Sequence, residues 1–335
     1  MRRAALSAVI AALAALGARN LAVPAFGGQR APAETQAEAG AVSKAQAAVD
    51  SAKSPQEKSA AMVALGRAYF DEGQEEKANE QYKAALDLDP QNAAAHLELG
   101  RLRIGDHNFS GAAAEFEATI RLAPEAGAGY GALGQLLAET GHSGDARPLL
   151  QKAADLDPTD WASRYRLALI LSGAGQYVPA RELLDEVVQI DPGNMPAREQ
   201  LALDRFRHSD AAGATAEGQS MLAKDPNSPE GHRVMALSFW KQREFEASLA
   251  ECAQALQGAP HSVMVLALQA LNLWQLDRKK EARQLLTEIS RDPEMRSSFA
   301  TPSAFCRLLV CDGHDVGVVS DFVHRNRWVA NPDEP

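Results

Sequence analysis

The stretch ALDLDP at residues 85–90 recurs along the chain and sets the spacing of the other motifs. Related stretches, AADLDP, VVQIDP, MLAKDP and ALQGAP, end at residues 158, 192, 226 and 260, and TIRLAP ends at residue 124. Each interval between successive prolines is therefore 34 residues. Because proline lacks an amide hydrogen and disfavours helical geometry in the residue before it, each proline predicts a boundary between helices.

Within one interval, small and large residues alternate on two segments separated by a glycine. In the interval that ends at residue 90, these residues are Leu65, Gly66, Tyr69, Gly73, Ala78, Tyr82 and Ala85. Glycine and alanine let two helix backbones approach closely, and the large side chains fill the space beside them. Later intervals repeat the pattern, for example with Leu99, Gly100, Ala112 and Phe116. The period therefore predicts a series of paired, closely packed helices.

This pattern resembles the tetratricopeptide repeat, a 34-residue helix–turn–helix unit that ends in proline. The resemblance covers residues 59–293, which would form seven repeats, with Pro293 one residue early. It implies an all-α tetratricopeptide-repeat solenoid, a right-handed superhelix with a concave groove. Binding in this family usually occurs in the groove, which the first helix of each repeat lines. The first helices of the first three repeats are expected at residues 59–72, 93–105 and 127–139.

The N-terminus is predicted to be a signal peptide rather than part of the fold. Two arginines precede an apolar run from Ala4 to Ala18, and VPA at 23–25 fits a cleavage site after Ala25. The run is shorter than the roughly 20 residues of a membrane span. We therefore expect a bacterial protein that is periplasmic or secreted; an uncleaved anchor and a cytosolic protein are the alternatives.

The remaining segments flank the repeats. Residues 26–58 are predicted to be a tether and an N-terminal capping helix, with helix at residues 34–53 and Pro55 as its limit. Residues 294–335 depart from the period and are predicted to form C-terminal capping helices and a tail. In that segment Cys306 and Cys311 are interpreted as buried thiols, with a disulfide or a metal site as alternatives.

Composition and motifs argue against several classes of function. The net charge of −10 without a basic block excludes nucleic acid as an expected partner. The common phosphate-binding, zinc-protease, nucleophile-elbow and dinucleotide motifs are absent from the sequence. We therefore expect no enzyme activity, no catalytic residues, no cofactor and no metal. Membrane contact is expected only through a partner or an uncleaved anchor.

Aromatic residues on the predicted first helices suggest where a partner binds. Phe206, Trp240 and Trp274 lie 34 residues apart, and Tyr165 and Arg233 lie on neighbouring turns. Aromatic side chains provide a large contact area with few rotatable bonds, so these five residues are the predicted groove residues. The alternative is that the aromatic residues form the core between repeats.

Gly218 stands where other repeats carry Phe116, Leu150 or Leu184. Because glycine removes a large side chain from the second helix, we expect a loose junction near residues 209–220.

The function predicted from the sequence is a non-catalytic scaffold that binds an extended peptide or a partner helix in the concave groove. A second interpretation is an accessory subunit for envelope polysaccharide or outer-membrane biogenesis. A remote third one is an enzyme whose chemistry lies in residues 294–335.

Overall fold

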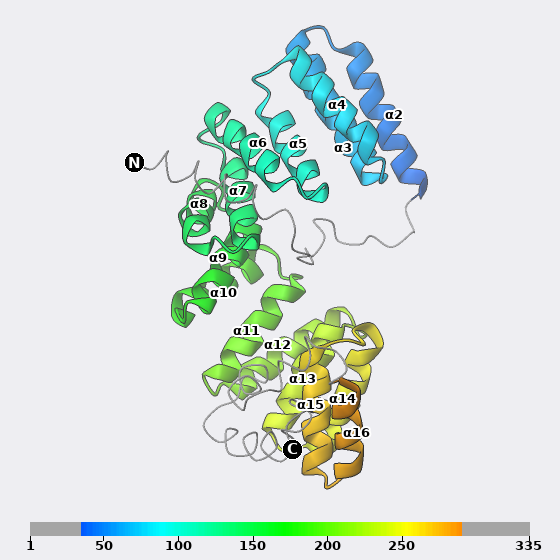
Figure 1. The fold of residues 1–335 in the computed structure, drawn as a ribbon, viewed down its shortest axis with the longest axis vertical. Coiled ribbons are helices and arrows are strands. Elements are labelled where there is room, and N and C mark those ends of the chain that lie inside the picture. The colour runs from blue at the N-terminus through cyan, green and yellow to red at the C-terminus, as the bar shows by residue number, and fades with distance from the viewer. Residues whose placement is uncertain (1–34, 290–335) are drawn as a thin grey trace. The chain divides into compact units, whose positions relative to one another are not determined.

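The structure is a computed structural model that describes residues 35–289; residues 1–34 and 290–335 lie outside the description. All regular elements in the described range are α-helices (Figure 1). The chain divides into two compact units, Met1–Ala174 (unit 1) and Gly175–Pro335 (unit 2). The predicted signal peptide, the first part of the tether and the segment with Cys306 and Cys311 are outside the described residues and stay predictions.

Unit 1 contains one preceding helix, three complete helix pairs and the first helix of a fourth pair. Its helices are α2 (Thr35–Ser51), α3 (Pro55–Asp71), α4 (Glu75–Leu88), α5 (Ala93–Gly105), α6 (Phe109–Leu122), α7 (Gly127–Glu139), α8 (Ser143–Leu156) and α9 (Trp161–Gly173).

Unit 2 begins with the second helix of the fourth pair. Its described helices are α10 (Tyr177–Ile190), α11 (Met195–Arg207), α12 (Ala211–Lys224), α13 (Pro229–Lys241), α14 (Phe245–Gly258), α15 (Val263–Gln275) and α16 (Lys279–Ile289).

Short polar residues mark where several helices begin. The side chains of Asn92, Asp160 and Ser228 accept hydrogen bonds from backbone amides three residues later, at 3.0–3.1 Å. Such caps satisfy amides that have no partner within the helix. Ser54 caps α3 in the same way, so Pro55 is the first residue of that helix. Proline is favoured there because its missing amide hydrogen would be unpaired in any case. As a result α3 begins four residues before the predicted position 59.

The turn inside each helix pair has a residue with positive φ at the same place in every repeat. These residues are Gly73, His107, Gly141, Gly175, Ser209, Arg243 and Asp277, which are again 34 apart. The next residue usually closes the turn, as when the Gln74 amide donates to the Tyr69 carbonyl at 2.8 Å. Glycine adopts this conformation without strain, whereas a side chain makes it unfavourable.

Each pair in unit 1 packs a small residue against a large one, as the sequence predicts. A Cβ atom on Gly66 would lie 2.4 Å from Cε1 of Tyr82, and one on Gly100 would lie 2.5 Å from Cε1 of Phe116. Tyr82 and Phe116 are buried. The glycines are therefore required for the helices to come this close.

Side chains of the next repeat fill the space beside Gly218, and the loose junction expected near residues 209–220 stays a prediction. A Cβ atom on Gly218 would lie 2.9 Å from Cγ1 of Val234 and 3.0 Å from Sδ of Met235. Both side chains come from α13, the first helix of the next repeat. The volume missing from α12 is thus supplied by α13, and α12 is a helix of the same length as α10 and α14.

Within each unit the first helices contact one another along the array. In unit 1, α3 contacts α5, α5 contacts α7 and α7 contacts α9; in unit 2, α11 contacts α13 and α13 contacts α15. The second helices α4, α6 and α8 in unit 1 and α12 and α14 in unit 2 each pack against the first helices on either side of them in the chain. The first helices therefore form one continuous layer in each unit, and any groove along that layer is built from their exposed side chains.

Candidate binding groove

The layer of first helices in unit 1 is hollowed by two adjoining cavities. One has a volume of about 450 Å³ and lies over α3 and α5; the other has a volume of about 310 Å³ and lies between α7 and α9. Arg101, Gln135 and Ala162 line both cavities. The two cavities therefore form one groove across the four first helices of unit 1, and we call it the unit 1 groove.

Two guanidinium groups share one carboxylate in this groove. Arg67 donates from Nε to Oε1 of Glu98 at 2.8 Å, and Arg101 donates from Nη1 to the same oxygen at 3.2 Å. The Glu98 side chain is 8% exposed, whereas those of Arg67 and Arg101 are 51% and 44% exposed. The cluster holds two positive charges for one negative charge, and its guanidinium groups reach solvent.

Glu139 organises the other end of the groove. It accepts hydrogen bonds from Nη2 of Arg166 at 2.9 Å and from Nε2 of Gln135 at 3.0 Å, both to Oε1. The pair between Arg166 and Glu139 joins α9 to α7. This arrangement fixes the amide of Gln135 at the point where the two cavities meet.

Aromatic side chains adjoin these polar groups. Phe70 and Trp161 are 38% and 40% exposed and line the two cavities. Tyr82 lies beneath the larger cavity, and burial followed by the nearby Glu98 carboxylate raises the pKa of its phenol. Because the ring is almost completely buried, Tyr82 supports the groove from below and keeps its proton at neutral pH.

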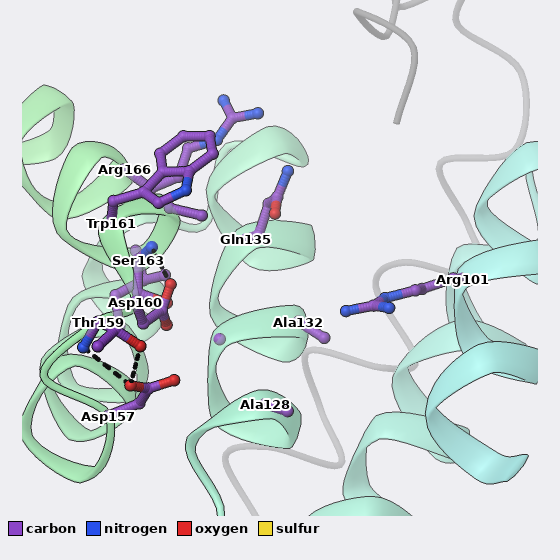
Figure 2. A pocket seen from close by; sticks show the side chains of 13 residues that line it. Arg101, Ala128, Ala132, Gln135, Asp157, Thr159, Asp160, Trp161, Ser163 and Arg166 are labelled. Atoms are coloured by element: carbon purple, nitrogen blue, oxygen red, sulfur yellow. Dashed lines mark hydrogen bonds between the residues drawn. The ribbon is translucent and has the colours of Figure 1, made fainter. Parts of the chain in front are cut away.

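Figure 2 shows how the smaller cavity is arranged, with Arg101 extending from α5 toward the face of α7 that carries Ala132 and Gln135. Trp161 and Arg166 lie on the opposite side, on α9. Small side chains on α7 leave the space between them open.

Two acidic residues beside the smaller cavity, Asp157 and Asp160, already accept hydrogen bonds from neighbouring residues. Asp157 accepts hydrogen bonds from the amide of Thr159 at 2.8 Å and from its hydroxyl at 2.7 Å, which lower the pKa of the Asp157 carboxyl. Asp160 caps α9. In the groove, Nε and Nη2 of Arg101 are not used in its hydrogen bonds to Glu98, and such donors suit ligand carbonyl or carboxylate oxygens.

The structure buries three of the predicted groove residues in a core. Phe206, Trp240 and Trp274 are 1%, 4% and 8% exposed and belong to one core cluster of unit 2. This is the core position that the sequence left open as the alternative. Tyr165 is half-buried on α9. A role of these residues in partner binding stays a prediction.

Arg233 does not present a free charge either. Its guanidinium pairs with Glu199 on the preceding first helix, with Nε 2.5 Å from Oε1. Burial raises the pKa of Glu199, and Arg233 opposes that shift. The pair joins α11 to α13, so Arg233 has a structural partner before any ligand binds.

Sequence reasoning missed Phe70, Glu98 and Trp161. A signal was present, because Arg67, Arg101 and Gln135 are 34 apart and occupy the helix position that holds Leu203, Leu237 and Leu271 in later repeats. A change from apolar to polar residues at one repeat position marks the part of the array that faces solvent.

Among residues 35–289, no group of three or more histidine, cysteine, aspartate or glutamate side chains could hold a metal ion. Of the helices described there, none is both long and apolar enough to span a membrane.

Solved structures confirm the predicted all-α repeat fold. The chain is 16% identical to pilF of Pseudomonas aeruginosa, with a TM-score of 0.56 over 62% of this chain and 94% of that one. It is 17% identical to PilW, described as a widely conserved type IV pilus biogenesis factor, with a TM-score of 0.54 over 61% and 94%. A third structure, the APC/C hetero-tetramer Cut9–Hcn1, is 16% identical, with a TM-score of 0.59 over 70% of this chain and 47% of that one.

Family models identify the repeats directly. No curated protein matches the sequence. A TPR repeat model matches residues 66–103, and two tetratricopeptide repeat models match residues 137–203 and residues 97–160 and 233–295. Together the three models cover more than half of the chain, and they fall on the helix pairs described above. The chain therefore belongs to the tetratricopeptide repeat family.

Proposed function

We propose that this protein is a non-catalytic interaction module that binds an extended segment of a partner protein in the unit 1 groove. The observation that carries the proposal is the pair of adjoining cavities, which share Arg101 and Gln135 and run across four first helices. Proteins of this family generally mediate protein–protein interactions and are typically not enzymes.

The chemistry of the groove favours a peptide over a small apolar ligand. Arg101 uses only Nη1 toward Glu98 in its described contacts, which leaves Nε and Nη2 for a ligand. Exposed Phe70 and Trp161 provide apolar contact area on either side of the arginines. An extended peptide presents carbonyl and carboxylate oxygens together with apolar side chains, which match these two kinds of surface.

The proposal includes export of the protein from a bacterial cytoplasm, where it would help to organise an envelope assembly. The charged, apolar and small-residue parts of residues 1–25 support this location. N-terminal sequencing of the protein from the envelope fraction should begin at Phe26, and intact Met1 recovered from the cytosol would contradict the proposal.

The binding site can be tested by photo-crosslinking in cells. A photoreactive amino acid at Gln135 should capture a partner that mass spectrometry can identify, whereas the same group at exposed Lys152 on α8 should not. Equal capture from the two positions would contradict a site in the groove.

The purified partner then allows a second test. Arg101→Ala should weaken its binding about tenfold, which corresponds to about 1.4 kcal/mol. Arg121→Ala, which removes an exposed arginine from α6, is the matched control and should leave the affinity unchanged. The melting temperature should be the same for both variants, because Arg67 still pairs with Glu98 when Arg101 is absent. Unchanged affinity for Arg101→Ala would refute the assignment.

A further inference from the structure

α15 has no exposed residue although few described helices surround it. Its sequence, VMVLALQALNLWQ, has polar side chains only at Gln269, Asn272 and Gln275, and its buried residues are Val265, Ala267, Leu268, Ala270, Leu271, Asn272, Leu273 and Trp274. A helix that is apolar all round requires neighbours all round. The described helices that pack against it are α13, α14 and α16. These belong to its own repeat and to the one before it.

The other first helices of unit 2 are also apolar at repeat positions where unit 1 carries polar or exposed residues. Leu203, Leu237 and Leu271 occupy the repeat position of Arg67, Arg101 and Gln135 and are at most 8% exposed. Phe206, Trp240 and Trp274 occupy the position that holds exposed Phe70 in the first repeat. In unit 1 this face is the open groove. In unit 2 the equivalent face is apolar and covered, and we call it the unit 2 apolar face.

We propose that the C-terminal segment of this chain, residues 290–335, docks on the unit 2 apolar face. The segment follows directly from α16, so its attachment point lies one helix away from α15. Its sequence carries two apolar sets at helical spacing, Phe305, Leu308 and Leu309 and then Val319, Phe322 and Val323. Each set would present one apolar stripe to the face.

Covalent attachment favours this occupant over a separate protein. A tethered segment has an effective concentration on the order of millimolar, so it occupies the face before a dilute partner can. The unit 2 apolar face is therefore filled by the chain itself, and the unit 1 groove is left for other proteins. This inference does not depend on what binds in the unit 1 groove.

Crosslinking in the full-length chain tests the contact without disturbing it. A photoreactive amino acid at Phe322 should form crosslinks within one chain to peptides of α11, α13 or α15. The same group at Asp333, beyond the apolar sets, is the control and should crosslink these helices less. Crosslinks from Phe322 to other parts of the chain, or only between chains, would overturn the proposal.

Point variants of the segment give a second readout. In a background with Trp161→Phe and Trp328→Phe, the fluorescence reports on Trp240 and Trp274. Leu308→Asp with Phe322→Asp should shift the emission to the red, and hydrogen exchange in α13 and α15 should accelerate about tenfold or more. Exchange in α3–α7 should not change. Unaltered emission and exchange would mean that the repeats bury these tryptophans alone and would overturn the proposal. If the double variant unfolds unit 2, Val323→Ala replaces it, with the same shifts expected at smaller amplitude.

Discussion

Unit 1 and unit 2 use the same repeat position in opposite ways. In unit 1 it carries Arg67, Arg101 and Gln135, which line an open groove; in unit 2 it carries Leu203, Leu237 and Leu271, which are buried. The 34-residue period fixes where a side chain lies on the first helix. The identity of the side chain then decides whether that position contacts solvent and ligands or becomes part of a core.

The two units also differ at the repeat position that Asp204, Ser238 and Asn272 share. In unit 2, Thr215 and Ser238 are hydrogen-bonded at 2.5 Å, Arg181 pairs with Asp204 at 2.6 Å, and Asn272 donates to Ser248 at 2.7 Å. In unit 1 the repeat position of Asp204, Ser238 and Asn272 holds only apolar residues, namely Ala68, Leu102, Leu136 and Ile170. In unit 2 the first helices therefore carry apolar residues on one side, and on the side that packs against the preceding second helices they carry hydrogen-bonded polar residues.

The largest effect is expected where the two units differ in burial. Trp240→Ala removes a buried ring from the core of unit 2 and should lower the free energy of unfolding by about 3–5 kcal/mol. Phe70→Ala, in the equivalent layer of unit 1, removes an exposed ring and should cost less than about 1 kcal/mol. Denaturant titration of both variants measures the difference. Equal losses would contradict the distinction between an open and a covered face.

A smaller effect is expected from the polar contacts of unit 2. Ser248 is fully buried, donates to the Ala236 carbonyl at 2.7 Å and accepts from Asn272. Ser248→Ala leaves both groups without this partner and should cost about 1–3 kcal/mol. Ser220→Ala, on the exposed side of α12, is the matched control and should have almost no effect. If the two variants melt alike, the polar contacts do not stabilise unit 2.

In the turns within helix pairs, replacing a non-glycine residue by glycine should raise the free energy of unfolding. His107 in unit 1 and Ser209, Arg243 and Asp277 in unit 2 adopt positive φ without being glycine. Arg243→Gly should therefore raise the free energy of unfolding by up to about 1 kcal/mol. Gly141→Ala places a side chain at the equivalent turn of unit 1 and should lower it by about 1–2 kcal/mol. A loss of stability in Arg243→Gly would show that its side chain does more than occupy the turn.

The smallest effect concerns pH. Hydrogen bonds from Thr159 lower the pKa of Asp157 in unit 1, and bonds from Gly213 and then Arg205 lower the pKa of Asp210 in unit 2. A lowered folded-state pKa stabilises the fold above the ordinary aspartate range, and this stability is lost as the pH falls through the folded-state pKa. Asp157→Asn should reduce the acid sensitivity of the melting temperature. An unchanged pH profile would contradict the contribution of this carboxylate.

The period of the sequence was sufficient to predict the helix pairs, because proline, glycine and the small–large pattern all act within one repeat. It was not sufficient to predict the packing at Gly218, since Val234 and Met235 of the following repeat fill that space. The positive φ of Arg243, which lies in the turn of its helix pair, was not predicted either, because the residue type arginine gives no local signal for this conformation.

The binding surface was harder to predict than the fold. Aromatic residues are common in interfaces, and this predicted groove roles for Trp240 and Trp274, yet the structure buries both. The polar groups of the groove are ordinary residues on a helical surface until Glu98 brings Arg67 and Arg101 together. The hydrogen bond between Arg67 and Glu98 joins two repeats, so no motif within a single repeat predicts it.

The shared carboxylate of Glu98 also has a kinetic consequence. In the proposed complex, a ligand carboxylate would bind Nε and Nη2 of Arg101 while Nη1 stays hydrogen-bonded to Glu98. Because Glu98 already neutralises part of the charge on Arg101, the ligand would gain less from this ion pair and would leave no unpaired guanidinium behind when it dissociates. Such an arrangement favours rapid turnover of partners in the groove over long residence of any one of them.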